Sequence, residues 1–472
     1  MKANFLFFIG LLVVISLACS LTTEAPPTLA PSTPMSTITP ESAMAPPTVQ
    51  AQPFEVEAPV GIVQPGSETI TPLNSIEMVN SETMIENIKT LVGFETRHVL
   101  SSQAPNRGIK AAENWLLEQL KAIAATSPNP DIRIDVYSHT FPMEWADQQV
   151  FPSNVIMAVT GTDAAAGVVL VTTHYDTALQ NWFVGDSYQP GANDNASGVA
   201  ALLELARIMV QKPRRATIVF VLFAAEETGR QGSQAFVQDF IQAQNIPVVA
   251  VLNMDIIGNP TGRRGERYDN TMRLFSAGPN ESSPSRMIAR MIDVAVSRYV
   301  PGMSVIIEDR LDRAGRWGDH MSFSEEGYPA VRLIEAADDP TIAHTTRDTI
   351  EQIDINYLRR TTQVALAALE MLADGPNPPS LRPLRPSTTD PGSMVLEWSH
   401  SPVCLSYVVA LRGFGSLTYD EFYTVQATTS LAWGGFKNFE SVTVACVDGE
   451  GRIGRFAPEL LIQPIVTQNT QP

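Results

Sequence analysis

The amino-acid sequence predicts an α/β domain with a mainly parallel, twisted sheet flanked by helices, followed by a small β-sandwich-like domain. Three observations lead to this prediction. Between residues 76 and 375, short apolar runs typical of buried strands alternate with amphipathic helical patterns. A proline-rich stretch at 376–386 interrupts the alternation and is predicted to be a linker. Beyond it, residues 387–464 contain short alternating runs with Trp398, Tyr407 and Trp433 at strand-like positions.

Each element of the predicted α/β domain has its own pattern. The helical segments carry apolar residues at spacings of three and four, whereas the strands are short and almost unbroken apolar runs. In chain order the predicted elements are the helices 81–92 and 108–123, the strands 132–137, 155–159 and 168–173, the helix 197–210, the strand 217–225, the helix 233–242 and the strand 248–254.

The chain begins with the features of an export signal. A short basic end precedes an apolar run at residues 5–17, which is too short for a comfortable membrane span. The run ends at Leu17-Ala18-Cys19-Ser20, which resembles a bacterial lipoprotein cleavage box, although Ser16 stands where leucine is usual. We therefore expect residues 1–19 to be a signal peptide and Cys19 to carry a lipid. The protein would be an exported cell-surface or periplasmic lipoprotein; the alternative is an ordinary secreted protein.

Residues 20–75 are predicted to form a tether and lead-in between that anchor and the α/β domain. As far as about Pro53 they are mostly Pro, Thr, Ser and Ala, with almost no charge and few large apolar residues. Such a segment cannot bury enough apolar surface to offset the entropy of folding, and its prolines stiffen it. At the other end of the chain, residues 465–472 are predicted to be a tail.

Two cysteines other than Cys19 are present, and both lie in the predicted β-sandwich domain. Cys404 and Cys446 could form a disulfide, because exported proteins meet an oxidising environment. The alternative is a pair of buried free thiols on neighbouring strands. The size of this domain and runs such as 395–398 and 407–409 loosely resemble fibronectin type III modules.

Metal-binding side chains directly follow three of the predicted strands. The strand 168–173 is followed by His174-Tyr175-Asp176, the strand 217–225 by Glu226-Glu227 and the strand 248–254 by Asp255. Each feature alone is more often a turn or a helix cap. In open α/β sheets, however, binding sites form outside the carboxyl ends of the strands, so these residues should converge. Asp194 at the start of a helix and His344 further along the chain complete the set.

This set of residues suits hydrolysis at two metal ions. Zinc accepts imidazole nitrogen and carboxylate oxygen as ligands. Two zinc ions about 3.5–4 Å apart need a carboxylate that bridges them, and Asp194 is well placed for that role. Neighbouring residues at a strand end point in different directions, so Glu227 can face a metal while Glu226 faces the attacking water.

The motifs around these residues resemble metallopeptidase family 28 (clan MH), the two-zinc aminopeptidases of the zinc-exopeptidase fold. The resemblance covers about residues 76–373 and is specific, because five motifs occur in the family's order and with its intervals. They are His174-Tyr175-Asp176, Gly191-Ala192-Asn193-Asp194-Asn195-Ala196-Ser197-Gly198, Ala225-Glu226-Glu227-Thr228-Gly229 with Gly232-Ser233, Asn253-Met254-Asp255-Ile256-Ile257-Gly258 and His344-Thr345-Thr346-Arg347-Asp348-Thr349.

The resemblance implies two Zn²⁺ per chain and a role for each site residue. One zinc would be held by His174, Asp255 and the bridging Asp194. The other would be held by Glu227, His344 and the same bridge. Asp176 would orient His174, as metal-bound imidazoles usually require. Glu226 would be the general base that moves a proton from water to the leaving amine.

Two positions depart from the family pattern. Gly318-Asp319-His320 occupies the place of a Ser-Asp-His stretch, and we expect it to form a wall and support of the site rather than to bind metal. Ala343 precedes the last ligand where many relatives have a tyrosine whose hydroxyl stabilises the tetrahedral intermediate. Trp182 and Phe183, between the first ligand motif and Asp194, are expected to pack within a loop; the alternative is that they shape the rim of the pocket.

The function predicted from the resemblance is removal of the N-terminal residue from peptides that have a free N-terminus. The formal charge of −18 argues against nucleic acid as a natural partner, because phosphate binding needs clustered Lys and Arg. Alternatives within the fold are a carboxypeptidase, which would need a cation such as Arg316 or Arg332, and a single-zinc glutaminyl cyclase. A further alternative is a catalytically inactive binding lipoprotein, although Glu226 and all the expected ligands are present.

Overall fold

The computed structural model describes residues 62–63, 73–276, 283–313, 317–426 and 428–462. The predicted signal peptide with Cys19, nearly all of the tether, Arg316 and the tail therefore lie outside the described residues. Within the described ranges, no helix is both long enough and apolar enough to cross a membrane.

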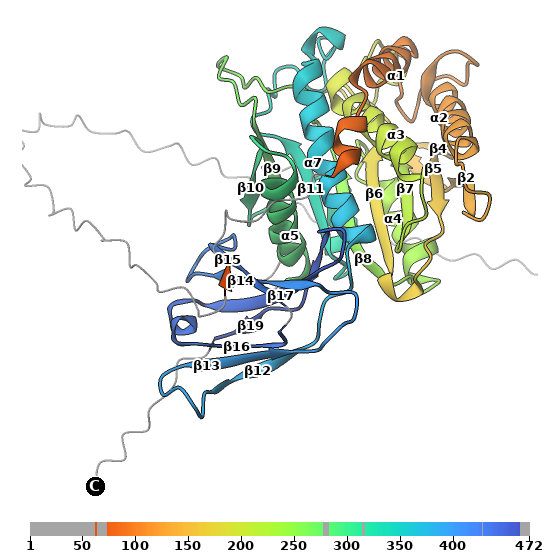
Figure 1. Cartoon of the computed structure of the whole chain (residues 1–472). Helices are drawn as coiled ribbons and strands as arrows, with labels where there is room; N and C mark the ends of the chain where they lie inside the picture. The colour runs from red at the N-terminus through yellow and green to blue at the C-terminus, as the bar shows by residue number, and fades with distance from the viewer. Residues whose placement is uncertain (1–61, 64–72, 277–282, 314–316, 427, 463–472) are drawn as a thin grey trace, which may run out of the picture. The chain divides into compact units, whose positions relative to one another are not determined.

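An eight-stranded mixed sheet forms the centre of the first domain (Figure 1). Its strands are β2 (Ile134–Thr140), β5 (Ser153–Val159), β6 (Val168–His174), β7 (Thr217–Phe223), β8 (Val248–Met254), β9 (Thr271–Phe275), β10 (Ser304–Glu308) and β11 (Ala330–Glu335). Their order across the sheet is β10-β9-β11-β8-β6-β7-β5-β2. Four of the seven neighbouring pairs are parallel, namely β10–β9, β11–β8, β8–β6 and β6–β7. The predicted fold class is confirmed.

Helices cover both faces of this sheet, which explains why its central strands are unbroken apolar runs. Val169 and Val171 of β6 belong to one core, whereas Leu170 between them belongs to the core on the opposite face. The first core is covered by α1 (Ser81–Gly93), α2 (Gly108–Ala125), α3 (Ser197–Met209), α5 (Pro284–Tyr299) and α7 (Ile355–Asp374). The second core is covered by α4 (Gln231–Phe236), the π-helix η4 (Val237–Gln242) and α6 (His320–Ser324).

Several short elements connect these strands and helices. They are η1 (Asn74–Met78), the hairpin of β3 (Met143–Trp145) and β4 (Gln148–Val150), η2 (Ala164–Ala166), the π-turn η3 (Ala192–Ala196) and η5 (Ile350–Gln352). Three helices are preceded by an N-cap residue whose side-chain oxygen accepts hydrogen bonds from the helix backbone. Asn80 and Asp354 each accept two backbone N–H groups from the first turns of α1 and α7, and Ser283 accepts one from the first turn of α5.

The C-terminal residues form two β-sheets that pack face to face around a common core. The larger sheet contains β1 (Ile62–Val63), β14 (Ser406–Arg412), β15 (Glu421–Gln426), β17 (Ser441–Val447), β18 (Ile453–Phe456) and β19 (Leu460–Leu461). The smaller contains β12 (Leu381–Pro386), β13 (Met394–Trp398) and β16 (Ser430–Trp433), and the 3-10 turn η6 (Gly434–Asn438) follows it. Side chains from both sheets, among them Trp398, Val409 and Val444, share one core. Cys404 and Cys446 are joined by a disulfide.

Two strands of this domain come from segments in which the sequence predicts no strand. Residues 381–386, within the predicted linker, form β12 at the edge of the smaller sheet. An edge strand tolerates proline because one side of it needs no N–H donor. Ile62–Val63, within the predicted tether, pairs antiparallel with β15.

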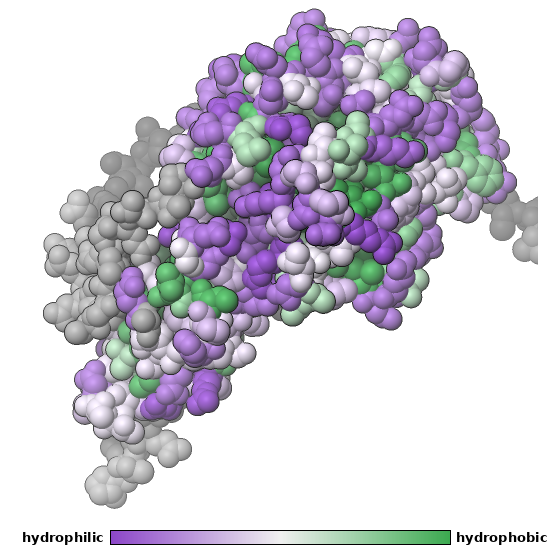
Figure 2. Space-filling view, turned by 45° about the vertical axis from the view of Figure 1, so that its right-hand side comes forward, coloured by the Kyte–Doolittle hydropathy of each residue, from purple (hydrophilic) through white to green (hydrophobic). Residues whose placement is uncertain are grey.

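The apolar residues lie mainly in these cores rather than on the surface. The face seen in Figure 2 is largely hydrophilic, and the hydrophobic residues visible there form separate patches. The outer face of the larger C-terminal sheet does not remain exposed. Val408 and Phe456 belong to the same core as the helices of the first domain.

Candidate metal centre

The predicted ligands come from five separate segments and line one cleft of about 260 Å³. His174 is the last residue of β6, Glu227 follows β7 and Asp255 follows β8, so the carboxyl ends of three neighbouring parallel strands supply three of them. Asp194 lies in η3, immediately before α3, and His344 lies in the connection from β11 to α7. Glu226 lines the same cleft.

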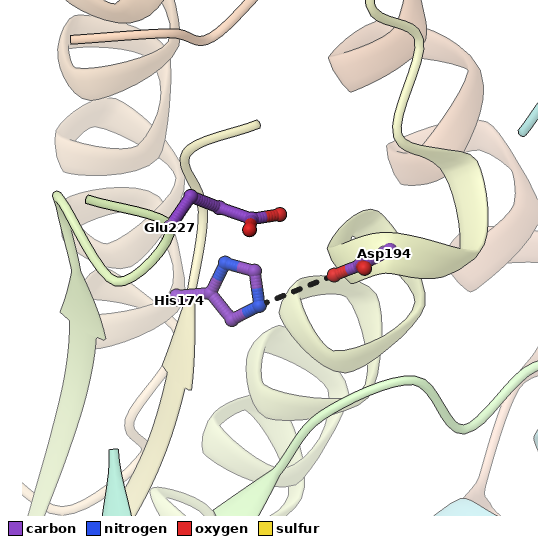
Figure 3. A group of neighbouring side chains, drawn as sticks. All are labelled: His174, Asp194 and Glu227. Atoms are coloured by element: carbon purple, nitrogen blue, oxygen red, sulfur yellow. Dashed lines mark ion pairs between the residues drawn. The ribbon is translucent and has the colours of Figure 1, made fainter. Parts of the chain in front are cut away.

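Asp194 lies between two pairs of predicted metal ligands. Its Oδ1 atom is 3.4 Å from Nε2 of His174, and its Oδ2 atom is 3.2 Å from Nε2 of His344. Nε2 of His174 also lies 3.4 Å from Oδ1 of Asp255, and Nε2 of His344 lies 3.1 Å from Oε2 of Glu227. Figure 3 shows the side chains of His174, Glu227 and Asp194 converging from different elements. Each oxygen of Asp194 thus faces a separate imidazole–carboxylate pair.

Buried carboxylates dominate the electrostatics of the cleft. Burial alone would lower the pKa of His344, but the charges of Glu227 and Asp194 outweigh it and raise that pKa to about 11. Burial would also raise the pKa of Asp194, but hydrogen bonds from His174 and His344 hold it well below the usual range. Burial, with nearby acids, raises the pKa of Glu226 well above its usual range. The cleft is therefore suited to bind cations.

The donor atoms fit zinc. One ligand atom each from His174, Asp194 and Glu227 lie within 4.8 Å of one another. Oε1 of Glu227 is buried and has no hydrogen-bond partner among the described residues, which leaves it available as a ligand. Imidazole and carboxylate groups are the set that zinc accepts in catalytic sites. The residues that would hold it are His174, Asp194 and Asp255 on one side, and Glu227 and His344 on the other.

Asp176 lies behind the cleft and holds the turn that carries both glutamates. Its two oxygens accept the backbone N–H groups of Glu226 and Glu227 at 3.1 and 3.2 Å. Oδ1 of Asp176 is 3.6 Å from Nδ1 of His174, which is longer than an ordinary hydrogen bond. The predicted orientation of His174 by Asp176 stays a prediction, whereas the contact with the glutamate turn is a structural role that the sequence did not reveal.

Two further buried residues fix the backbone on which the ligands stand. Asp348 accepts the backbone N–H groups of Asn193 and Asp194 at 2.8 and 2.9 Å. The guanidinium of Arg97 donates to the carbonyl oxygens of Tyr175, at 2.7 Å, and Gly191, at 2.9 Å. The sequence pattern assigns no role to Asp348 or Arg97, because their partners are far away in the chain.

The backbone is strained at three positions beside the ligands. Ala225, Ile256 and His344 have φ values of 62°, 60° and 56°, in the left-handed region that non-glycine residues seldom occupy. Each such residue costs about 1–2 kcal/mol, and such residues cluster at functional sites. The surrounding packing therefore determines where Glu226, Asp255 and His344 point.

Arg332 lies on the other side of Asp255 and explains one departure from the family pattern. Its guanidinium is 2.9 Å from Oδ2 of Asp255. A Cβ atom at Gly318 would lie 3.0 Å from the Arg332 side chain and 3.1 Å from the same Asp255 oxygen, so glycine leaves room for this pair. His320 is buried, and burial together with Arg332 lowers its pKa to about 3. His320 does not line the cleft, so it does not form the expected wall, and its supporting role stays a prediction.

Comparisons with known proteins point in one direction. The model described as Peptidase family M28 matches residues 154–369. A probable zinc metalloprotease of Leptosphaeria maculans is 32% identical over 385 residues, which cover 75% of this chain and 88% of that protein. A probable zinc metalloprotease of Pyricularia oryzae is 35% identical over 356 residues, covering 68% of this chain and 70% of that protein.

A solved structure shares the fold of the first domain. The LapA aminopeptidase of Legionella pneumophila is 23% identical in sequence, and it superimposes with a TM-score of 0.51. The similarity covers 64% of this chain and 74% of that chain. At this level of identity the likeness concerns the fold.

Proposed function

Since the chain belongs to peptidase family M28 and is a zinc metallopeptidase, we propose that it is an aminopeptidase that binds two zinc ions. The observation that carries the proposal is the position of Asp194. Its two oxygens face two separate imidazole–carboxylate pairs, His174 with Asp255 and His344 with Glu227. A bridging carboxylate between two ligand sets is what a pair of zinc ions requires.

Glu226 is the residue that we propose as general base. Its side chain lines the cleft and accepts no hydrogen bond from the residues that the structure describes. Its backbone is held by Asp176, so the carboxylate is positioned but remains available to a water molecule. Zinc, when bound, supplies the Lewis acid that polarises the scissile carbonyl group. Glu226 would take a proton from the attacking water and give it to the amine that leaves.

The charges around the cleft favour a substrate with a free amine over one with a free carboxylate. Four carboxylates line the cleft, from Asp194, Glu226, Glu227 and Asp255. A carboxypeptidase needs a cation to bind the terminal carboxylate of its substrate. The side chain of Arg332 is only 3% exposed and is paired with Asp255, so we assign it to that carboxylate rather than to a substrate.

A panel of three peptides with one sequence tests the proposal. The first peptide is free at both ends, the second is N-acetylated, and the third is C-terminally amidated. We expect the purified chain to release the first residue from the free and amidated peptides at similar rates and to leave the acetylated one intact. Cleavage of the acetylated peptide, or a need for a free carboxyl end, would contradict the aminopeptidase assignment.

Two further measurements separate the remaining alternatives. Metal analysis of the purified chain should find close to two zinc ions, and one ion would contradict the bridging role of Asp194. A peptide that begins with glutamine should gain the mass of water by hydrolysis. Loss of ammonia without hydrolysis would identify a cyclase instead.

We also propose that the enzyme acts outside the cytoplasm, anchored by a lipid on Cys19. The sequence Leu17-Ala18-Cys19-Ser20 supports this proposal. Expression in a bacterium that processes lipoproteins, with radioactive palmitate, should label the full chain but not a Cys19→Ala variant. Equal labelling of both, or of neither, would contradict the anchor.

A further inference from the structure

Trp182 forms a wall of the cleft beside the last predicted ligand. Its ring meets the ring of His344 edge to face, with 4.8 Å between centroids and 69° between planes. Both residues line the cleft with Asp194 and Glu227. Because Nε2 of His344 is within 3.2 Å of both carboxylates, the indole lies in the immediate surroundings of the candidate metal centre.

The backbone at Trp182 is fixed from several directions. Its carbonyl oxygen is 2.9 Å from Nε1 of Trp145, which donates to it, and 3.0 Å from Nε2 of His98. The N–H of Gln180 donates to the carbonyl of His344 at 3.1 Å, which ties this loop to the loop of the ligand. The next residue, Phe183, stacks on Trp145. The fold therefore fixes the main chain from which the indole extends into the cleft.

The indole N–H of Trp182 has no partner among the described residues, although the N–H of Trp145 in the same cluster is used. The indole nitrogen is not buried, so it is open to the cleft or to solvent. An indole nitrogen can only donate a hydrogen bond. A rigid, neutral donor beside the reacting groups suits an oxygen on which negative charge develops.

The two arginines that line the cleft are both engaged in ion pairs. Arg332 is paired with Asp255, and Arg230 lies near the exposed Glu325. Trp317 is on the cleft wall but makes no ring contact with His344 within the described residues. Ala343, directly before His344, carries no donor in its side chain. The geometry therefore singles out Trp182.

We propose that the indole N–H of Trp182 donates a hydrogen bond to the carbonyl oxygen of the scissile bond, an inference that rests on the proposed peptidase function. As water adds to the carbonyl carbon, the π electrons move onto the oxygen, and the bond from Trp182 strengthens. When the C–N bond breaks, those electrons restore the C=O group, and the amine leaves with the proton that Glu226 transfers. The indole keeps its own proton throughout, so Trp182 acts as a donor and not as an acid.

The variant Trp182→Phe tests this role, because phenylalanine keeps an aromatic wall against His344 and removes the donor. We expect kcat to fall about 10- to 100-fold with KM changed less than about threefold, since the lost bond is strongest in the transition state. Trp115→Phe on α2 is the matched control, because it removes an indole N–H away from the cleft. We expect that variant to keep the kcat of the unmodified chain.

Binding provides a second readout that does not depend on turnover. An alkylboronic acid adds water to become tetrahedral and so imitates the charged oxygen. Its affinity should fall in Trp182→Phe by the same factor as kcat, while the zinc content of the protein stays constant. If phenylalanine disturbs folding, benzothienylalanine incorporated at position 182 removes only the N–H, because sulfur replaces nitrogen in the same ring system.

The outcomes separate the two proposals. An unmodified chain that hydrolyses no peptide would overturn the proposed function and, with it, the role of Trp182. An active chain whose 182 variants keep kcat and boronic acid affinity within about twofold would overturn the role of Trp182 alone. A parallel loss of zinc and activity in Trp182→Phe, with full activity in the benzothienylalanine protein, would also overturn it, because packing against His344 would then explain the effect.

Discussion

Oδ2 of Asp348 accepts the backbone N–H of Asp194 at 2.9 Å, so one buried acid holds the main chain of another that faces the cleft. Oδ1 of Asp348 accepts the neighbouring N–H, from Asn193, at 2.8 Å. The side chain of Asn193 in turn donates to Glu335 and accepts from Gly258. The segment that carries Asp194 is thus fixed by the side chains of Glu335 and Asp348 and by the backbone N–H of Gly258, as precise bridging requires.

Replacing Asp348 with alanine should weaken zinc binding. The variant loses both bonds to the Asp194 segment, and loss of such outer contacts typically lowers metal affinity about 10- to 100-fold. The measurement is the zinc retained after dialysis against increasing chelator concentrations. Asp354→Ala is the matched control, because Asp354 also accepts two backbone N–H groups, at the start of α7. It should lower stability by about 1 kcal/mol but leave zinc retention unchanged. Equal zinc retention in both variants would contradict the assigned role of Asp348.

The adjacent glutamates should respond differently to the same substitution. Glu226→Gln should keep zinc and lower kcat by about 100- to 10,000-fold, because an amide cannot accept the proton from water. Glu227→Gln should lose zinc, because the carboxylate that faces His344 is removed. Both backbone N–H groups that Asp176 holds are present in either variant. Metal analysis and steady-state kinetics on the two proteins would distinguish base from ligand, and a Glu226→Gln enzyme with normal turnover would exclude the base.

The centre of the fold could be predicted from the sequence because its signals are local. Strands β6, β7 and β8 are short apolar runs buried on both faces, and a polar residue marks the carboxyl end of each. Since parallel strands end at the same edge of a sheet, this pattern alone predicts that His174, Glu227 and Asp255 come together. The family resemblance added the pairing of ligands and the general base.

Elements that depend on distant partners could not be predicted in this way. The sequence pattern does not predict helix α5, which buries Arg286 and Arg290 among its apolar residues. From the sequence alone, an arginine is predicted to lie on the surface, because its buried partner is not apparent. The partner of Arg290 is Glu459, which is 169 positions away. Arg97 likewise binds carbonyl groups 78 and 94 positions further along. Such residues have no periodicity that would reveal them.

Asp293 on α5 should make the stability of the protein depend on pH. Burial raises its pKa to about 6 in the folded state, compared with about 3.9 in an unfolded chain. Between these values the folded state binds more protons, so the free energy of unfolding falls as pH rises through the window of about 4 to 6. Above it, the folded protein carries the full cost of the buried charge.

Asp293→Asn removes that charge and should stabilise the protein only where the aspartate is ionised. At pH 8 we expect a gain of about 1–3 kcal/mol in the free energy of unfolding, because two units of pKa correspond to about 2.7 kcal/mol before screening by solvent. Near pH 4 the gain should largely disappear. Urea unfolding at both pH values measures the difference. The exposed Asp131→Asn serves as the control, and a gain at Asp293 that is the same at both pH values would contradict the assignment.

Glu459 joins the C-terminal sheets to the first domain through a buried ionic network. Oε1 of Glu459 is 2.7 Å from a guanidinium nitrogen of Arg290 on α5, and Oε2 is 3.1 Å from Nε of Arg412 on β14. Both guanidinium groups are fully buried, and Ser441 donates a further hydrogen bond to Oε2. Two arginines from different domains therefore share one carboxylate, and Arg412 also pairs with Glu440 at 2.7 Å.

Glu459→Gln should destabilise the folded chain strongly. Removing one member of a buried ionic network costs more free energy than replacing the whole network with apolar residues. Removal of this charge leaves the buried guanidinium of Arg290 without Glu459 and that of Arg412 with Glu440 alone, and we expect a loss of about 3–5 kcal/mol. Glu397→Gln, which breaks the exposed ion pair with Arg385, should leave stability unchanged. Urea unfolding followed by tryptophan fluorescence would compare the two variants. If both behave alike, apolar packing such as that of Val408 and Phe456 joins the domains, and the network adds specificity without stability.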